Sequence, residues 1–276
     1  MIGNNTLISK FAKIGNNVSI MHNCIVEDNV EICDEVFIDS NTIIRNGTKI
    51  GKNTTIGSNC IIGEYLMDYY EDRQQHNYNL VIGDNSIIRS SSIIYTDSII
   101  GNNFQTGHNV VIREKTNIGN HCSIGTASDL QGYCEFGDYV RLHSDVHVGQ
   151  LTKIDDYVWI FPRVTFTNDP MPPSDIRIGI HVHSFAIIAT NVVILPGKDI
   201  AQDSLVGAGS VVTKDVPKYK VVCGNPARVV KDVRDIKEVE TGDNHYPWRE
   251  HFERNMPWRN VGFDKWATMN NYKVEE

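Results

Sequence analysis

The chain has 276 residues, a formal net charge of −8 and a hydrophobic content of 41%. An acidic chain without a concentrated basic patch does not suit nucleic acid or an anionic membrane surface, so we expect neither as a partner. The first residues lack the regions of a signal peptide, and no apolar run approaches the roughly 18 residues of a membrane-spanning helix. We therefore expect a cytoplasmic location.

A six-residue period runs along most of the chain. Mainly branched apolar residues recur at every sixth position over 2–62, 82–166 and 182–212. Six is neither a helical period nor a strand alternation, and it predicts short strands joined by sharp corners, with the repeated residue pointing inward. The fourth residue after it is usually small and is also expected inside. Four cysteines occupy this small position, which predicts reduced core thiols rather than metal or redox roles: Cys24, Cys60, Cys122 and Cys134.

The period defines the expected domains. Residues 1–217 form the repeat domain, which is interrupted by loops at 64–80 and 167–181. Loops on a rigid scaffold often carry binding groups, although they also serve as decoration or subunit contacts. The first loop contains four tyrosines, whose rings can stack on a base. Residues 218–276 are expected to be an extension with a helix that packs on the repeat.

That helix is expected to begin at Pro247. Trp248, Phe252 and Met256 then share one face, which is typical of packing rather than of a cofactor site.

The repeat resembles the hexapeptide-repeat left-handed β-helix, in which three hexads make one coil of 18 residues. The resemblance implies an all-β fold, a left-handed parallel β-helix with a projecting loop and a short helical tail. Residues 107–126 (GHNVVIREKTNIGNHCSIGT), 141–145 (RLHSD) and 166–174 (FTNDPMPPS) resemble enzymes that N-acylate nucleotide-linked amino sugars. Residues 186–231 resemble the C-terminal coils of the CoA-dependent members.

This resemblance implies an acyl-CoA-dependent N-acyltransferase for a dTDP-linked amino-dideoxy sugar in surface-glycan biosynthesis. The similarity is greatest to the anthrose-biosynthesis branch, whose substrate is dTDP-4-amino-4,6-dideoxyglucose. The acyl donor is expected to be acetyl-CoA or a hydroxyacyl-CoA, with no metal. The enzyme is expected to be a homotrimer with active sites at subunit interfaces. The alternatives are a dTDP-3-amino sugar N-acetyltransferase and a sugar or serine O-acetyltransferase.

Two further classes share the scaffold. A γ-class carbonic anhydrase uses histidine zinc ligands, but the pairs His143/His147 and His181/His183 lack the expected spacing. The other class is a non-enzymatic ice-binding or assembly module. An ice-binding coil is expected to carry an outward threonine ladder, and none runs the length of this sequence.

An 18-residue coil stacks residues that are 18 positions apart. One corner column holds Glu114, Gly132, Gln150 and Asn168. On a flat wall, Asp129 and His147 are expected to pair, which favours a structural role for His147. His143 replaces a corner glycine, so its ring is expected to point outward.

Site residues are assigned from the resembling motifs and these positions. His143 is the expected catalytic residue, with a solvent or trimer contact as the alternative. The expected substrate-binding residues are His108, Arg113, Glu114, Gln150, Asn168 and Asp169. The expected CoA-binding residues are Ala189, Ala208, Gly209, Lys214, Arg228 and Lys231. Gln150 stands where the 3-amino sugar enzymes are expected to carry a glutamate, which indicates a different sugar or acyl group.

The chemistry joins an amine to a thioester carbonyl. A neutral sugar amine attacks, an oxyanion forms and CoA leaves as a thiolate, which can accept the amine proton. We expect positioning to supply most of the rate, with His143 orienting the sugar or assisting proton transfer.

Overall fold

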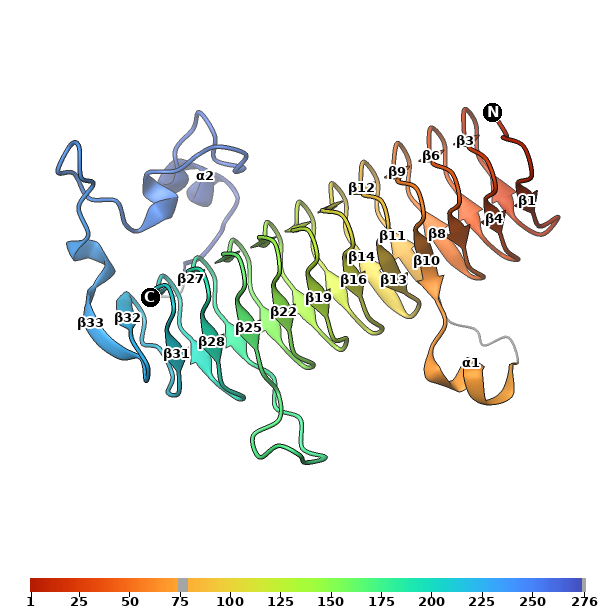
Figure 1. Ribbon diagram of the computed structural model, residues 1–276. Helices are drawn as coiled ribbons and strands as arrows, with labels where there is room; N and C mark the ends of the chain where they lie inside the picture. The colour runs from red at the N-terminus through yellow and green to blue at the C-terminus, as the bar shows by residue number, and fades with distance from the viewer. Residues whose placement is uncertain (74–78, 275–276) are drawn as a thin grey trace.

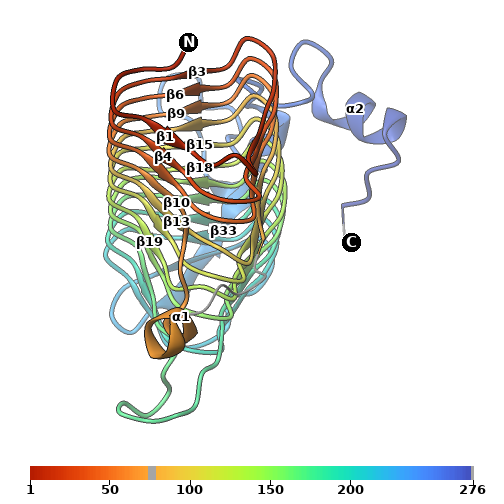
Figure 2. The ribbon, with the colours of Figure 1, turned by 90° about the vertical axis from the view of Figure 1, so that its right-hand side faces the viewer.

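The computed structural model describes residues 1–73 and 79–274. The described chain winds into a long parallel β-helix whose three flat faces are sheets (Figure 1). Seen from one end, the coils stack into a prism with three edges (Figure 2). The predicted left-handed hexapeptide-repeat β-helix is thus confirmed.

Each coil contributes one short strand to each of the three sheets. The eleven-stranded sheet contains β1 (Leu7–Ile8), β4 (Ile25–Val26), β7 (Ile43–Ile44), β10 (Ile61–Glu64), β13 (Ile93–Tyr95), β16 (Val111–Ile112), β19 (Asp129–Leu130), β22 (His147–Val148), β25 (Thr165–Phe166), β28 (Val193–Ile194) and β31 (Val211–Val212). The ten-stranded sheet contains β2 (Lys13–Ile14), β5 (Glu31–Ile32), β8 (Thr48–Ile50), β11 (Leu80–Ile82), β14 (Ser98–Ile100), β17 (Asn117–Ile118), β20 (Glu135–Phe136), β23 (Lys153–Ile154), β26 (His181–Val182) and β29 (Asp199–Ile200). The twelve-stranded sheet contains β3 (Ser19–Ile20), β6 (Phe37–Ile38), β9 (Thr55–Ile56), β12 (Ile87–Ile88), β15 (Gln105–Thr106), β18 (Ser123–Ile124), β21 (Arg141–Leu142), β24 (Trp159–Ile160), β27 (Ile187–Ile188), β30 (Leu205–Val206), β32 (Lys220–Cys223) and β33 (Arg228–Asp232).

The hexad residues fill the core, because their apolar side chains point into the prism from nearly every strand of the coil. Ile38, Ile94 and Ile160 are fully buried, and so is Cys60 at the small inward position. All six cysteines are free thiols, and burial raises the pKa of Cys122 and Cys134 to about 12. The first coil is the exception: Ile2 is 53% exposed, since it has a neighbouring coil on one side only.

The corners require a left-handed backbone residue in almost every hexad. Asn17, Asn23 and Asn29 take this position with φ of 54–58°, and asparagine tolerates that region better than most residues. The third edge, between the ten- and twelve-stranded sheets, begins with Asn17, but four successive later coils place His121, Tyr139, Tyr157 and Phe185 at this position. Their rings stack at centroid distances of 4.5, 5.2 and 5.1 Å, and this stacking offsets part of the backbone strain.

Two excursions leave the coil at one edge, the edge that follows the eleven-stranded sheet (Figure 1, Figure 2). The first follows β10 and contains the helix α1 (Met67–Asp72), which the sequence did not predict. Residues 74–78 of that loop, including Tyr78, lie outside the described residues. The second follows β25 and returns at β26, so Lys153 pairs with His181 rather than with the residue 18 positions on.

The C-terminal segment begins after Pro217 with β32, which pairs in parallel with β30. The chain then turns back, and β33 pairs antiparallel with β32. It continues through the 3₁₀ helices η1 (Val233–Asp235) and η2 (Trp248–Glu250) and the helix α2 (Phe263–Met269). The helix expected at Pro247 is only the three residues of η2. Trp248 and Arg249 are consecutive and both buried, whereas an amphipathic α-helix buries positions three or four apart.

The segment docks on the aromatic column of the third edge. Tyr157 and Phe185 are buried beneath Trp248, Met256 and Trp258. The indole Nε1 of Trp248 donates to the Phe185 carbonyl at 2.9 Å.

A buried ion pair also fixes the segment. Arg249 pairs with Asp203, and burial raises the pKa of the Asp203 carboxyl. Within the described residues, no helix is both long and apolar enough to cross a bilayer.

Candidate functional site

A hollow of about 450 Å³ opens on the outer face of the twelve-stranded sheet. Its floor is backbone, because Gly107 and Gly125 carry no side chain there. A Cβ at Gly125 would lie 2.3 Å from the backbone carbon of His143. The polar walls come from residues on four coils and from the C-terminal segment: Arg89, His108, Arg141, His143, Trp159 and Arg254.

His143 follows β21, and its backbone N–H donates to the Ile160 carbonyl of the next coil at 2.8 Å. Its ring stacks on Phe161 at 4.7 Å and 13° and lies 6.3 Å from Trp159. Burial, with a smaller contribution from the Arg141 guanidinium, lowers the pKa of His143 below its usual 6.5. The imidazole is therefore neutral at pH 7, which suits a group that accepts a proton or orients an amine.

The hollow has a cationic wall. Arg141 lies 5.0 Å from the Trp159 ring, and burial with the nearby Arg254 lowers the pKa of Arg141. Arg141 Nε and Trp159 Nε1 are buried without a hydrogen-bond partner among the described residues. Unpaired buried donors are costly, so this geometry favours a ligand that accepts hydrogen bonds and carries negative charge.

The His143 edge, defined as the corner that follows the twelve-stranded sheet, continues toward the C-terminus with Phe161 and then with small residues. Backbone hydrogen bonds stack His143, Phe161, Ala189 and Gly207 on successive coils. At about 4.8 Å per coil, Gly207 lies roughly 14 Å from His143. Ala208 and Gly209 are exposed beside it. This strip leaves room for a thin chain that ends at His143.

The expected basic CoA contacts are spread out. Lys214 follows β31 of the eleven-stranded sheet, while Arg228 and Lys231 belong to β33. All three are exposed. Only Ala189, Ala208 and Gly209 of the six expected residues lie on the His143 edge.

The Glu114 edge, defined as the corner column Glu114, Gly132, Gln150 and Asn168, is a different edge of the prism. Glu114 is only 8% exposed and receives two hydrogen bonds from Arg113, at 2.8 and 3.0 Å. Gln150 and Asn168 are half-buried. Within one chain, the structure does not bring these residues to His143; of the expected substrate residues, only His108 lines the hollow.

Asp169 organises its own loop. Its carboxylate accepts hydrogen bonds from the Ser174 hydroxyl and backbone N–H at 2.6 and 2.8 Å and from the Met171 N–H at 3.0 Å. These bonds, with Arg177 nearby, lower the pKa of Asp169. The expected pair on the flat wall is present, with His147 Nδ1 3.2 Å from Asp129 Oδ2.

The sequence did not predict four of the six wall residues of the hollow named above. Arg141 lies in the RLHSD motif and Trp159 stands 18 positions later, so the column rule already stacks them. Arg89 and Arg254 carried no comparable signal, since Arg254 reaches the hollow only through the docking of the C-terminal segment.

Comparisons with known proteins agree with the fold. Residues 29–64 match the family of bacterial transferase hexapeptide (six repeats). Galactoside O-acetyltransferase of Escherichia coli K12 is 33% identical over 135 residues, which are 41% of this chain and 64% of that protein. The 2,3,4,5-tetrahydropyridine-2,6-dicarboxylate N-acetyltransferase of Staphylococcus aureus JH9 is 39% identical over 54 residues, 20% of this chain and 23% of that protein.

The solved structure of UDP-N-acetylglucosamine O-acyltransferase from Moraxella catarrhalis RH4 has a TM-score of 0.51 and 24% identity. The match spans 83% of this chain and 73% of the Moraxella chain. The matches to the two curated relatives above span less than two thirds of their lengths. The solved structure thus shares the β-helix fold with this chain, and the match to the hexapeptide family is limited to residues 29–64.

Proposed function

We propose that the protein is an acyl-CoA-dependent N-acyltransferase that acts on the amino group of a dTDP-linked amino-dideoxy sugar. The observation that carries this proposal is the pairing, on one edge, of a cationic hollow with a strip of small residues. Arg141 and Arg254 suit the diphosphate of a nucleotide sugar. The strip from Ala189 to Gly209 suits a pantetheine arm, and His143 lies where the two meet.

The chemistry follows from this placement. The sugar amine attacks the thioester carbonyl, the new C–N bond forms, and the C–S bond breaks as CoA leaves. The amine proton passes to neutral His143 or to the departing thiolate. Because the thiolate has a pKa near that of cysteine, about 8.5, it is a competent acceptor, so we assign His143 mainly to positioning.

The sugar is proposed to be dTDP-4-amino-4,6-dideoxyglucose. The 3-amino isomer is the first alternative, and Gln150, in place of the glutamate expected in the 3-amino sugar enzymes, supports a different sugar or acyl group. The similarity to galactoside O-acetyltransferase supports a second candidate, O-acetyl transfer. An alcohol is a weaker nucleophile than an amine, so that reaction makes His143 an obligatory base.

We also propose a cytoplasmic homotrimer with active sites between subunits. The His143 edge and the Glu114 edge lie on different corners of one prism. Residues of the two edges can therefore meet only when a neighbouring chain presents its Glu114 edge, with both loop excursions, to this chain's hollow.

An acceptor panel tests the reaction. The purified protein is incubated with acetyl-CoA and, in separate samples, dTDP-4-amino and dTDP-3-amino sugars, UDP-amino sugars, serine and a galactoside, and thiol release is followed. We expect turnover of a dTDP-amino sugar. Arg254→Gln should raise the KM for that sugar, whereas Arg259→Gln, an exposed arginine of the same segment, should not. Turnover of the alcohols alone would contradict N-acyl transfer.

A further inference from the structure

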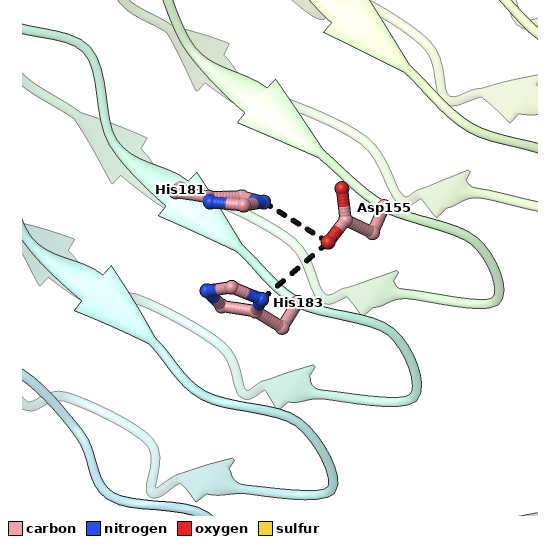
Figure 3. A group of neighbouring side chains, drawn as sticks. All are labelled: Asp155, His181 and His183. Carbon is pink, nitrogen blue, oxygen red and sulfur yellow. Dashed lines mark hydrogen bonds and ion pairs between the residues drawn. The ribbon is translucent and has the colours of Figure 1, made fainter. Parts of the chain in front are cut away.

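Three potential metal ligands meet at the edge that carries the aromatic column, away from the hollow (Figure 3). Asp155 follows β23, His181 lies in β26 and His183 follows β26. The two strands are neighbours in the ten-stranded sheet, although the excursion after β25 separates them in sequence. The site is therefore assembled across the one rung that this excursion interrupts.

The three donor atoms have the spacing of a coordination shell. His181 Nε2 lies 2.9 Å and His183 Nδ1 lies 3.5 Å from Asp155 Oδ2. All three atoms lie within 4.8 Å of one another. A tetrahedral cation with metal–ligand bonds of about 2.0–2.1 Å separates its ligands by roughly 3.3 Å. The separations of 2.9 and 3.5 Å lie on either side of this value, and the bound of 4.8 Å means that no pair of donors has to close by more than about 1.5 Å to hold an ion.

A second carboxylate fixes the tautomer of His183. Both oxygens of Asp199 lie 3.0 Å from His183 Nε2. If Nε2 donates its proton to Asp199, the Nδ1 lone pair of neutral His183 faces the Asp155 carboxylate. Two acceptors then point at each other, and a proton or a cation between them removes the conflict. Carboxylates that orient ligating histidines in this way are a regular feature of metal sites.

The surroundings suit a half-buried ion. The side chains of Asp155, His181 and His183 are 25–31% exposed. Lys153 Nζ approaches the other oxygen of Asp155 at 3.5 Å, but it is 52% exposed and free to turn to solvent. Tyr272 and Lys273 line a small cavity beside His183, so the C-terminal segment passes next to the site.

We propose that Asp155, His181 and His183 bind a divalent transition-metal ion of the zinc class. Imidazole and carboxylate donors suit this class, and three protein ligands leave a position for water. The ion joins the coil before the second excursion to the coil after it, and so stabilises the interrupted rung. The site lies outside the hollow, and it does not depend on the proposed acyl transfer.

Calorimetric titration of chelator-treated protein with ZnCl₂ tests the site. We expect one ion per chain and a rise in Tm on binding. Asp155→Asn and His181→Gln should each weaken binding at least tenfold, and Asp199→Asn should weaken it roughly 10–100-fold. His147→Gln is the matched control, because His147 also pairs with one aspartate but has no third potential ligand nearby among the described residues. This variant should bind zinc as the wild type does.

Cobalt provides a second readout. Co²⁺ bound by these donors gives visible absorption bands, which His181→Gln should remove. The wild type failing to bind zinc at micromolar concentrations, or the Asp155 and His181 variants binding as tightly as the wild type, would overturn the proposal. Circular dichroism of the metal-free variants distinguishes lost ligands from lost folding, since an unaltered metal-free Tm shows that the coil remains intact.

Discussion

The His143 ring packs on Phe161 and lies near Arg141, and its burial together with the Arg141 charge lowers its pKa. A neutral imidazole can hold the amine by accepting a hydrogen bond, and glutamine keeps a polar group of similar reach. We expect His143→Gln to lower kcat/KM about 10²-fold, the size of effect that misplacement of a substrate produces. Steady-state kinetics with the dTDP-amino sugar measures it. A loss near 10⁴-fold would instead make His143 an obligatory base.

The lowered pKa of His143 predicts a loss of activity on the acid side of the pH–activity profile. Because the folded-state pKa lies below 6.5, the contribution of His143 to activity is expected to be lost below pH 6.5, as pH decreases through the folded pKa. Protonation of the sugar amine, which must be neutral to attack, lowers kcat/KM separately. Arg141→Gln should move the loss due to His143 to higher pH, since the repulsive charge is gone while burial remains. The pH profile of kcat/KM and NMR titration of the ring protons measure the shift. An unchanged acid side of the profile in the His143→Gln variant would assign the titration to another group.

At the scale of elements, the C-terminal segment connects packing to the hollow. Trp258 is fully buried against Tyr157 and the helix α2. Trp258→Ala should cost about 3–5 kcal/mol, more than a small docked segment is expected to withstand. We expect the segment to detach while the coil stays folded, so that Arg254 leaves the hollow.

Limited proteolysis and sugar binding check this prediction together. Cleavage should appear within 233–274, the KM for the nucleotide sugar should rise, and the thermal transition of the coil should remain. Arg254→Gln is the control, because it should weaken sugar binding without new cleavage. Loss of the coil transition in Trp258→Ala would show that the two parts unfold as one unit.

The elements also show what sequence could predict. The six-residue period fixes which side chains point inward, so it predicts both the strand register and the buried positions, such as Ile94 and Cys122. The same rule paired Asp129 with His147. The roles of Arg254 and Asp155 could not be predicted, because they depend on contacts with segments distant in sequence. The six-residue period carries no signal for such contacts. The expected helix at Pro247 was wrong because the spacing of apolar residues could not reveal that Arg249 is buried as well.

For the whole molecule, the separation of the two edges makes subunit mixing informative. His143→Gln and Asn168→Ala each damage one edge. If the site forms between neighbouring chains, mixed trimers contain sites in which both edges are intact. With random assembly from equal amounts, about a quarter of the sites are then complete. Co-expression of the two variants with different tags, followed by activity measurement, tests this. No recovery above the separate variants would place the site within one chain.

The docking of the C-terminal segment has a consequence during synthesis. Trp159 leaves the ribosome roughly 5–20 s before Arg254 at about 5–20 residues per second. During that interval the coil is able to stack its rungs, but Tyr157 and Phe185 have no cover. The nascent chain therefore displays an apolar strip that a chaperone can recognise, and its cationic hollow gains its last arginine only after the scaffold is complete.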